Sequence, residues 1–271
     1  MNDLMRAEAP FRVWGEGHAR PVLALHCSLA HAGAWSGVAQ RLSGVALTAF
    51  DQPGHGRAAA WDGVTDLQTL TTQIAAEFAE RLGGGAPIDL IGHSFGATVC
   101  LRLALERPEL VRSLTLVEPV IFAAARAAGS PAFDEFRVGH VAYETAIRQG
   151  DRAGAAAIFH AVWGGGMDFD DLPDVQQRYM LDRIHIIDAQ GPALHADTGG
   201  LLRYMGLESV GIPVLLVEGA TSPPVIDAIM TELARRLPMA TRLVVPGAGH
   251  MVPITHPDAV AAGIAAHLGQ T

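Results

Sequence analysis

Residues 90–98 of the chain read Leu90-Ile91-Gly92-His93-Ser94-Phe95-Gly96-Ala97-Thr98. The apolar run over residues 87–91 predicts a strand, and the residues from Ala97 onward predict a helix. A Gly-x-Ser-x-Gly pattern between a strand and a helix is typical of a nucleophile elbow, where small glycines permit a sharp turn and the serine hydroxyl is exposed. We therefore predict that Ser94 is a nucleophile and that the first amides of the helix face it.

Apolar runs on both sides of this stretch predict further strands. They cover residues 21–25, 45–50, 114–117, 213–217 and 242–245. Residues 11–14 and the segment before Pro21 predict a short hairpin at the edge.

Segments between the strands have helical spacing. They cover residues 35–42, 67–82, 97–106 and 257–268. Alternation of strand and helix predicts an α/β fold with a mostly parallel sheet flanked by helices.

One interval interrupts the alternation. Residues 121–211 are rich in alanine, have helical spacing and are broken by glycine and proline. Connections between strand and helix are short, so we interpret this interval as an inserted helical cap. The prediction is a core domain built from residues 1–120 and 212–271, with a cap over residues 121–211.

Composition limits the classes of partner. A net charge of -9, with 19 Lys and Arg residues and no basic run, argues against nucleic acid or an anionic membrane. Both cysteines, Cys27 and Cys100, lie in apolar stretches, which favours a reducing compartment. Residues 1–10 do not form a signal peptide, and no apolar run approaches the roughly 20 residues that span a bilayer. We expect a cytoplasmic protein with a small-molecule substrate, and a homodimer remains possible.

Three motifs in this order resemble the α/β-hydrolase superfamily, specifically its members with a helical cap after the sixth strand. They are the elbow around Ser94, the loop Asp51-x-x-Gly54-x-Gly56, and Gly249-His250 after the last strand. The resemblance covers residues 11–268. It implies that His250 is the base that activates Ser94.

The resemblance also implies an oxyanion hole formed by the backbone amides of Phe95 and Ser28. The usual His-Gly pair of that loop is His26-Cys27 here. We expect His26, Leu29 and His93 beside the substrate pocket, with the His93 ring orienting the turn. Cys27 has no base motif beside it and is interpreted as a small buried side chain.

The catalytic acid is where the chain departs from the family. The family commonly carries Asp in a turn after the penultimate strand, and the chain has Ser222 there. Serine cannot supply the negative charge that stabilises an imidazolium. Glu118, at the end of the strand after the elbow helix, is the substitute that some superfamily members use, with Asp227, an acid-free dyad and the weaker Glu218 as alternatives.

The leading hypothesis is a serine hydrolase that cleaves an ester or thioester of a small to medium, largely apolar acid through an acyl-enzyme. One alternative is cleavage of a carbon-carbon bond by the same triad, and another is a non-catalytic ligand-binding protein on the same scaffold. We expect no cofactor and no metal site. Aromatic residues of the cap line an acyl pocket or form the core of the cap: Phe133, Phe136, Phe159, Trp163 and Phe169.

Overall fold

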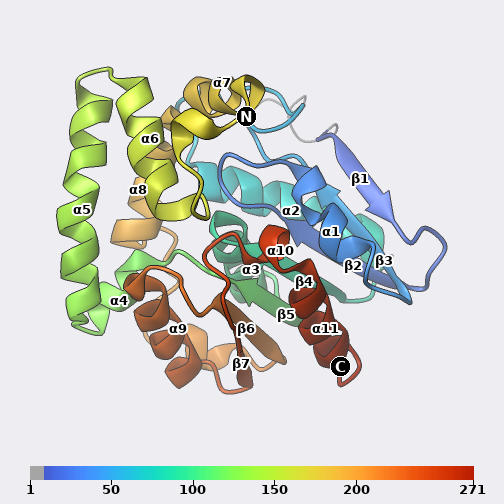
Figure 1. Ribbon diagram of the computed structural model, residues 1–271. Helices are drawn as coiled ribbons and strands as arrows, with labels where there is room; N and C mark the ends of the chain where they lie inside the picture. The colour runs from blue at the N-terminus through green and yellow to red at the C-terminus, as the bar shows by residue number, and fades with distance from the viewer. Residues whose placement is uncertain (1–8) are drawn as a thin grey trace.

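The structure is a computed structural model that describes residues 9–271. Within these residues the chain forms a seven-stranded sheet in the order β1-β3-β2-β4-β5-β6-β7 (Figure 1). The strands are β1 (Phe11–Trp14), β2 (Arg20–Leu25), β3 (Val45–Phe50), β4 (Ile88–His93), β5 (Val111–Val117), β6 (Val214–Gly219) and β7 (Ala240–Val245). Among the described strands, only β1 runs antiparallel to its neighbour. The predicted fold class, α/β with a mostly parallel sheet, is confirmed.

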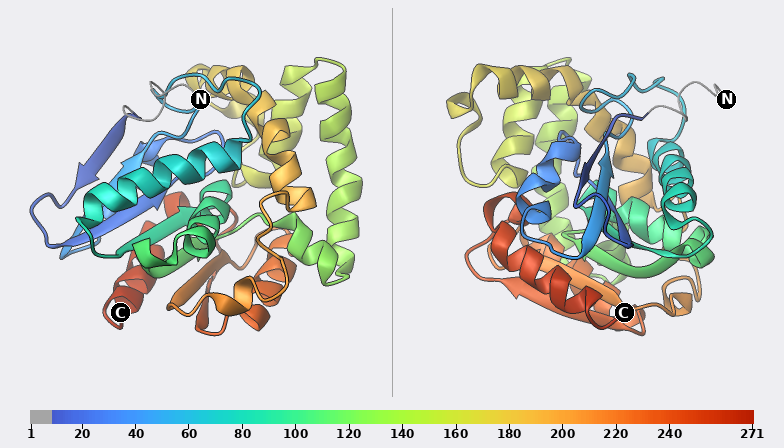
Figure 2. Two further views of the ribbon diagram at one scale, coloured as in Figure 1. Left: turned by 180° about the vertical axis from the view of Figure 1, so that it is seen from behind. Right: turned by 90° about the vertical axis from the view of Figure 1, so that its right-hand side faces the viewer.

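Helices cover both faces of the sheet. They are α1 (Ser36–Ala39), α2 (Leu67–Gly83), α3 (Phe95–Glu106), α9 (Pro224–Arg236), α10 (Val252–Thr255) and α11 (Pro257–Leu268). Helices α1 and α11 lie on the face turned toward the viewer in Figure 1, and α2 and α3 lie on the opposite face, which Figure 2 shows from behind.

This double covering explains why the strands are continuous apolar runs. Side chains alternate between the two faces of a strand. In β2, Val22 and Ala24 pack in the core beneath α1 and α11, whereas Leu23 and Leu25 pack in the core beneath α2 and α3. All four side chains are fully buried.

The predicted hairpin at the edge is corrected. Strand β1 pairs with β3, and its Phe11 lies opposite Phe50. Strand β2 lies between β3 and β4 and hydrogen-bonds to both, so it has no free edge with which β1 could pair.

Five α-helices separate β5 from β6, and we call them the helical insertion. They are α4 (Phe122–Ala127), α5 (Pro131–Arg148), α6 (Arg152–Trp163), α7 (Asp174–Arg183) and α8 (His185–Ala196). A small core of their own includes Tyr143, Ala155 and Ile184. The insertion follows the fifth strand of the described sheet, whereas the family members that the sequence resembles have their cap after the sixth strand. The numbering differs because the described chain has only one strand, β1, before β2. The domain boundaries at residues 120 and 211 stay a prediction.

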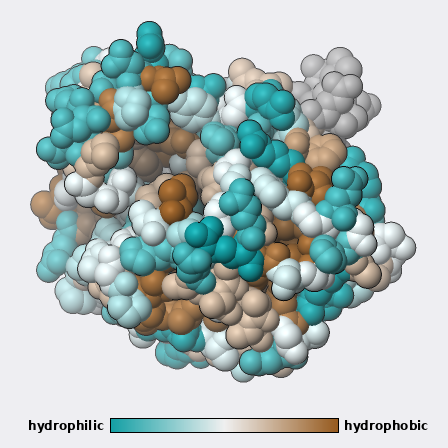
Figure 3. All heavy atoms as spheres, turned by 45° about the vertical axis from the view of Figure 1, so that its right-hand side comes forward, coloured by the Kyte–Doolittle hydropathy of each residue, from teal (hydrophilic) through white to brown (hydrophobic). Residues whose placement is uncertain are grey.

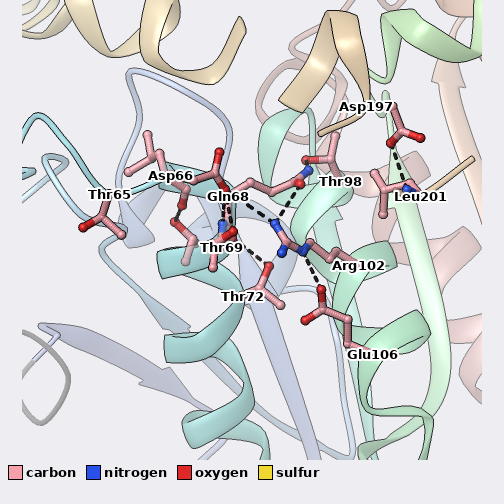
Figure 4. A network of polar contacts seen from close by, with 12 residues as sticks. Thr65, Asp66, Gln68, Thr69, Thr72, Thr98, Arg102, Glu106, Asp197 and Leu201 are labelled. Atoms are coloured by element: carbon pink, nitrogen blue, oxygen red, sulfur yellow. Dashed lines mark hydrogen bonds and ion pairs between the residues drawn. The ribbon is translucent and has the colours of Figure 1, made fainter. Parts of the chain in front are cut away.

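A polar network fixes the helix that follows the elbow (Figure 4). The Gln68 amide on α2 donates to the Thr98 hydroxyl on α3 at 3.0 Å and accepts from Arg102 at 3.3 Å. Arg102 also pairs with Glu106 one turn further along α3, at 2.7 Å. These contacts set the position of α3 relative to α2.

Hydrophilic side chains cover much of the molecular face drawn in Figure 3, with hydrophobic side chains in smaller groups between them. Among the described helices, none combines the length and the apolar character needed to cross a bilayer.

Candidate active site

The turn between β4 and α3 holds Ser94 in an unusual backbone conformation. Its φ is 55° and its ψ is −116°, a region that L residues rarely adopt and that is strained. A Cβ at Gly92 would lie 2.5 Å from the carbonyl oxygen of Gly96, and a Cβ at Gly96 would lie 2.5 Å from that of Leu25. Only glycine fits at both positions, so the Gly-x-Ser-x-Gly spacing is a steric requirement of this turn.

Ser94, His250 and Glu118 form a continuous chain of hydrogen bonds. The Ser94 hydroxyl lies 3.0 Å from Nε2 of His250, and Nδ1 of His250 lies 2.8 Å from Oε2 of Glu118. A carboxylate only accepts hydrogen bonds, so Nδ1 of His250 carries a proton and donates a hydrogen bond to Glu118. Nε2 is then free to accept the proton of Ser94.

Glu118 is completely buried at the end of β5. Its second oxygen, Oε1, accepts from the backbone amide of Gly219 at 2.6 Å and from the hydroxyl of Ser222 at 2.7 Å. Ser222 stands at the position where the family commonly carries its acid. The side chain at that position therefore contacts the carboxylate of Glu118 instead of contributing one.

The other acidic candidates are paired elsewhere. Asp227 and Glu218 both form ion pairs with Arg242, each at 2.5 Å. The structure therefore brings Glu118 to His250 and places the other two carboxylates on the guanidinium of a neighbouring strand.

The two predicted oxyanion donors lie on neighbouring elements. Phe95 is the first residue of α3, and the first amides of a helix have no acceptor inside it. Ser28 lies in the loop after β2, followed by Leu29 in the left-handed region with a φ of 57°. The Tyr179 hydroxyl on α7 steadies this loop by donating to the carbonyl of Ala30 at 2.8 Å.

A cavity of about 750 Å³ opens above Ser94, between the loops that follow the strands and the helical insertion. Ser94, His250, Ser28, Leu29 and Cys27 form its floor. Aromatic rings of the insertion form its wall: Phe122, Phe133, Phe136, Phe159 and Trp163. The wall is mainly apolar, which suits the acyl part of a substrate.

Two ring contacts lie in the wall of the cavity. The Trp163 ring meets the His250 ring edge-on, with 4.6 Å between centroids, and so covers the imidazole. The ring of His195 stacks on Phe122 at 4.8 Å, and burial lowers the pKa of His195 to about 4. His195 is therefore neutral near pH 7, whereas the ionisable side chains of Arg126, Arg137, Glu144 and Asp188 also line the cavity.

The sequence as a whole is similar to those of known proteins. A family model described as "Alpha/beta hydrolase family" matches residues 22–263. The chain belongs to the alpha/beta hydrolase family. This confirms the resemblance inferred from the three motifs.

Relatives of this hydrolase include Lipase LipV from Mycobacterium tuberculosis, 30% identical over 93% of this chain and 94% of that protein. A pimeloyl-[acyl-carrier protein] methyl ester esterase from Neisseria meningitidis serogroup C is 30% identical over 80% of each chain. Among solved structures, a thermophilic esterase from Thermogutta terrifontis superposes with a TM-score of 0.69 at 20% identity, covering 97% of this chain and 93% of that one. That structural likeness shows the shared fold.

In this hydrolase, His26 and His93 lie outside the cavity lining, which corrects their predicted place beside the substrate. The Gln52 backbone amide donates to Nε2 of His26, whose Nδ1 then donates to the carbonyl of Cys27. His93 donates through Nε2 to the carbonyl of His250 at 2.9 Å. Both rings are used to hold loops of the site. Leu29 is part of the cavity floor, in the pocket where the sequence predicted it.

Asp51 and Cys27 have structural roles in the loops beside the site. Asp51 accepts from the amides of Ala32 and Arg57, at 2.7 and 2.9 Å, and so ties its own loop to the one after β2. Burial raises the pKa of the Cys27 thiol to about 12, which keeps it protonated and a poor nucleophile.

Some residues of the site could not be predicted from the sequence. Gln190 of α8 accepts a hydrogen bond from the Ser28 hydroxyl at 2.6 Å and lines the cavity. It is a single amide in a helical stretch, and no pattern marks it. Phe169 of the five predicted aromatics packs in the core of the insertion instead of the cavity wall.

Within residues 9–271, no group of three or more His, Cys, Asp or Glu side chains is arranged to hold a metal ion. The absence of a cofactor stays a prediction.

Proposed function

We propose that this enzyme is a serine hydrolase that cleaves an ester or thioester of a small to medium, largely apolar acid. The observation that carries the proposal is the hydrogen-bonded chain from Ser94 through His250 to Glu118 at the floor of an apolar cavity. The names of two relatives, a lipase and a methyl ester esterase, support ester cleavage.

The first half of the reaction acylates Ser94. Nε2 of His250 takes the hydroxyl proton while Oγ of Ser94 attacks the carbonyl carbon, and Glu118 stabilises the imidazolium that forms. The developing oxyanion is bound by the backbone amides of Phe95 and Ser28. His250 then gives the proton to the leaving alcohol or thiol, and the acyl group remains on Ser94.

The second half releases the acid. A water molecule replaces the alcohol beside His250, loses a proton to Nε2 and attacks the acyl carbon. Collapse of this second intermediate returns the proton to Ser94 and frees the acid. The aromatic wall holds the acyl chain through both halves.

Hydrolysis of p-nitrophenyl butyrate tests the proposal. We expect steady turnover by the wild type and a fall to the uncatalysed background in Ser94→Ala. Ser130→Ala, which changes a serine just before α5 that does not line the cavity, is the matched control and retains turnover. If Ser94→Ala keeps most of the turnover, the proposal is wrong.

A further inference from the structure

Gln190 carries an unused hydrogen-bond donor beside the cavity. The side chain is 1% exposed, and it lines the same cavity as Ser94 and His250. Its Oε1 accepts from the Ser28 hydroxyl at 2.6 Å, whereas its Nε2 is buried and has no hydrogen-bond partner within residues 9–271. Buried amide groups are nearly always paired, and an unpaired one costs about 1–3 kcal/mol.

The place of this donor is fixed by Ser28. The backbone amide of Ser28 is a proposed oxyanion donor, and its hydroxyl holds the Gln190 amide by Oε1. Nε2 is attached to the same carbon as Oε1, so it lies beside the loop whose Ser28 amide is proposed to bind the scissile carbonyl oxygen. The surrounding wall is mainly apolar, and a purely hydrocarbon acyl chain would leave Nε2 unpaired.

Resting on the function proposed above, we propose that Gln190 binds substrate and that the preferred acyl group carries a hydrogen-bond-accepting oxygen within a few atoms of the scissile carbonyl. The Nε2 group donates to that oxygen when the acyl chain occupies the cavity. The rest of the chain contacts the aromatic wall. The enzyme therefore selects for an oxygen-bearing acyl group over the hydrocarbon of the same shape.

Two pairs of esters test this directly. In the first pair, p-nitrophenyl methoxyacetate is compared with p-nitrophenyl butyrate, and in the second, p-nitrophenyl β-methoxypropanoate is compared with p-nitrophenyl pentanoate. Each pair differs by one ether oxygen in place of a methylene, at two successive positions. An ether oxygen only accepts, so it reports on the Nε2 donor. The measured quantity is the ratio of kcat/KM for the ether ester to that for the alkyl ester.

Gln190→Met keeps the length of the side chain and removes the amide. We expect the ratio to fall about tenfold in at least one pair, because a lost hydrogen bond of about 1.4 kcal/mol corresponds to that factor. Comparing variant with wild type on the same esters cancels their different chemical reactivity. Ser28→Ala, which removes the hydroxyl that holds Gln190 but keeps the backbone amide, should lower the ratio in the same direction.

The matched control is Gln149→Met, at an exposed glutamine just after α5 that does not line the cavity, for which we expect an unchanged ratio. Unchanged ratios in Gln190→Met for both pairs would overturn the inference. If Gln190→Met does not fold, the wild type alone tests the inference. Its ratio of kcat/KM values is then divided by the ratio of the rates at which hydroxide hydrolyses the same two esters. A quotient near one in both pairs would overturn the inference. Failure of the wild type to hydrolyse any of the four esters would overturn the proposed function itself.

Discussion

Both oxygens of Glu118 accept hydrogen bonds, one from His250 and the other from Gly219 and Ser222. The carboxylate is thereby held in the orientation that keeps the proton on Nδ1 of His250. We predict that Glu118→Gln lowers kcat/KM about a thousandfold, because an amide can neither stabilise the imidazolium nor hold the same tautomer. Steady-state kinetics on p-nitrophenyl butyrate measures this. A loss of less than about tenfold would show that the acid lies elsewhere or is not needed.

A substitution at Ser222 tests the orientation of Glu118 without changing its charge. Ser222→Ala removes one hydrogen bond to Oε1 and leaves the carboxylate and its contact with His250 in place. We expect kcat/KM to fall by no more than about tenfold, the effect of a single hydrogen bond. A loss as large as that of Glu118→Gln would mean that the hydroxyl itself takes part in the chemistry.

His93 links stability to pH. Burial, and next the neighbouring His250, lower the pKa of His93 to about 3, so the folded state holds it neutral. The unfolded chain takes up a proton below about pH 6.5, so the stability that neutral His93 provides is lost as pH falls from there toward 3. Between pH 7.5 and pH 5 we expect a loss of about 2 kcal/mol from this residue, at about 1.4 kcal/mol per unit.

His93→Gln isolates this contribution from those of the other buried histidines. Glutamine does not titrate, and its amide still has a donor for the carbonyl of His250. Urea unfolding at the two pH values should show a smaller loss of stability in the variant, by about 2 kcal/mol. Equal losses in both proteins would mean that His93 is not the titrating group.

At the scale of elements, the elbow depends on how closely β2, β4 and α3 approach each other. A Cβ at Gly96 would lie 2.5 Å from the carbonyl oxygens of both Leu25 and His26, which are backbone atoms that cannot turn aside. We predict that Gly96→Ala costs about 3 kcal/mol or more of folding free energy and displaces Ser94. Chemical denaturation and ester turnover measure the two effects.

Gly139 on α5 offers the matched control, since a Cβ there meets no atom within 4 Å. Alanine has the higher helix propensity, so Gly139→Ala should stabilise the protein by about 0.5–1 kcal/mol. If Gly96→Ala were as stable as the wild type, the steric account of the elbow would be wrong.

The elements that the sequence predicted well are those whose cause is local. Buried strands such as 21–25 and 45–50 were found because both faces of the sheet are covered and the runs are wholly apolar. The partner of β1 could not be predicted, because it depends on β2 having both edges occupied by β3 and β4. The helix expected at residues 35–42 is shorter, and α1 spans only Ser36–Ala39.

Site residues likewise divide into those that a local motif identifies and those that depend on distant contacts. Ser94 and His250 stand in local motifs that name them, whereas the proximity of Glu118 and Ser222 depends on β5 lying beside β6. Gln190 reaches the loop after β2 from a helix 162 positions further along the chain. Such contacts follow from the packing of the insertion over the sheet, for which the sequence holds no local signal.

At the scale of the whole molecule, Tyr179 joins the helical insertion to the sheet. Its hydroxyl accepts from the Gly56 amide at 2.7 Å and donates to the Ala30 carbonyl at 2.8 Å, so α7 holds two loops beside the site. We predict that Tyr179→Phe lowers the free energy of unfolding by about 1–3 kcal/mol and kcat/KM about tenfold, because the loop that carries Ser28 loses its support.

Tyr204→Phe is the control for this change, because the Tyr204 side chain is 93% exposed. It should leave both quantities unchanged. Equal behaviour of the two variants would mean that the insertion is held over the site by its apolar contacts alone.

Labelling with a fluorophosphonate probe, followed by mass measurement of the intact protein and of its peptides, tests the central claim that Ser94 is a nucleophile activated by His250 and Glu118. We expect one label per wild-type chain, on the peptide that contains Ser94. We also expect no label in Ser94→Ala and greatly slowed labelling in His250→Ala and Glu118→Gln. A wild type that stays unlabelled, or a label on another residue that persists in Ser94→Ala, would contradict the account.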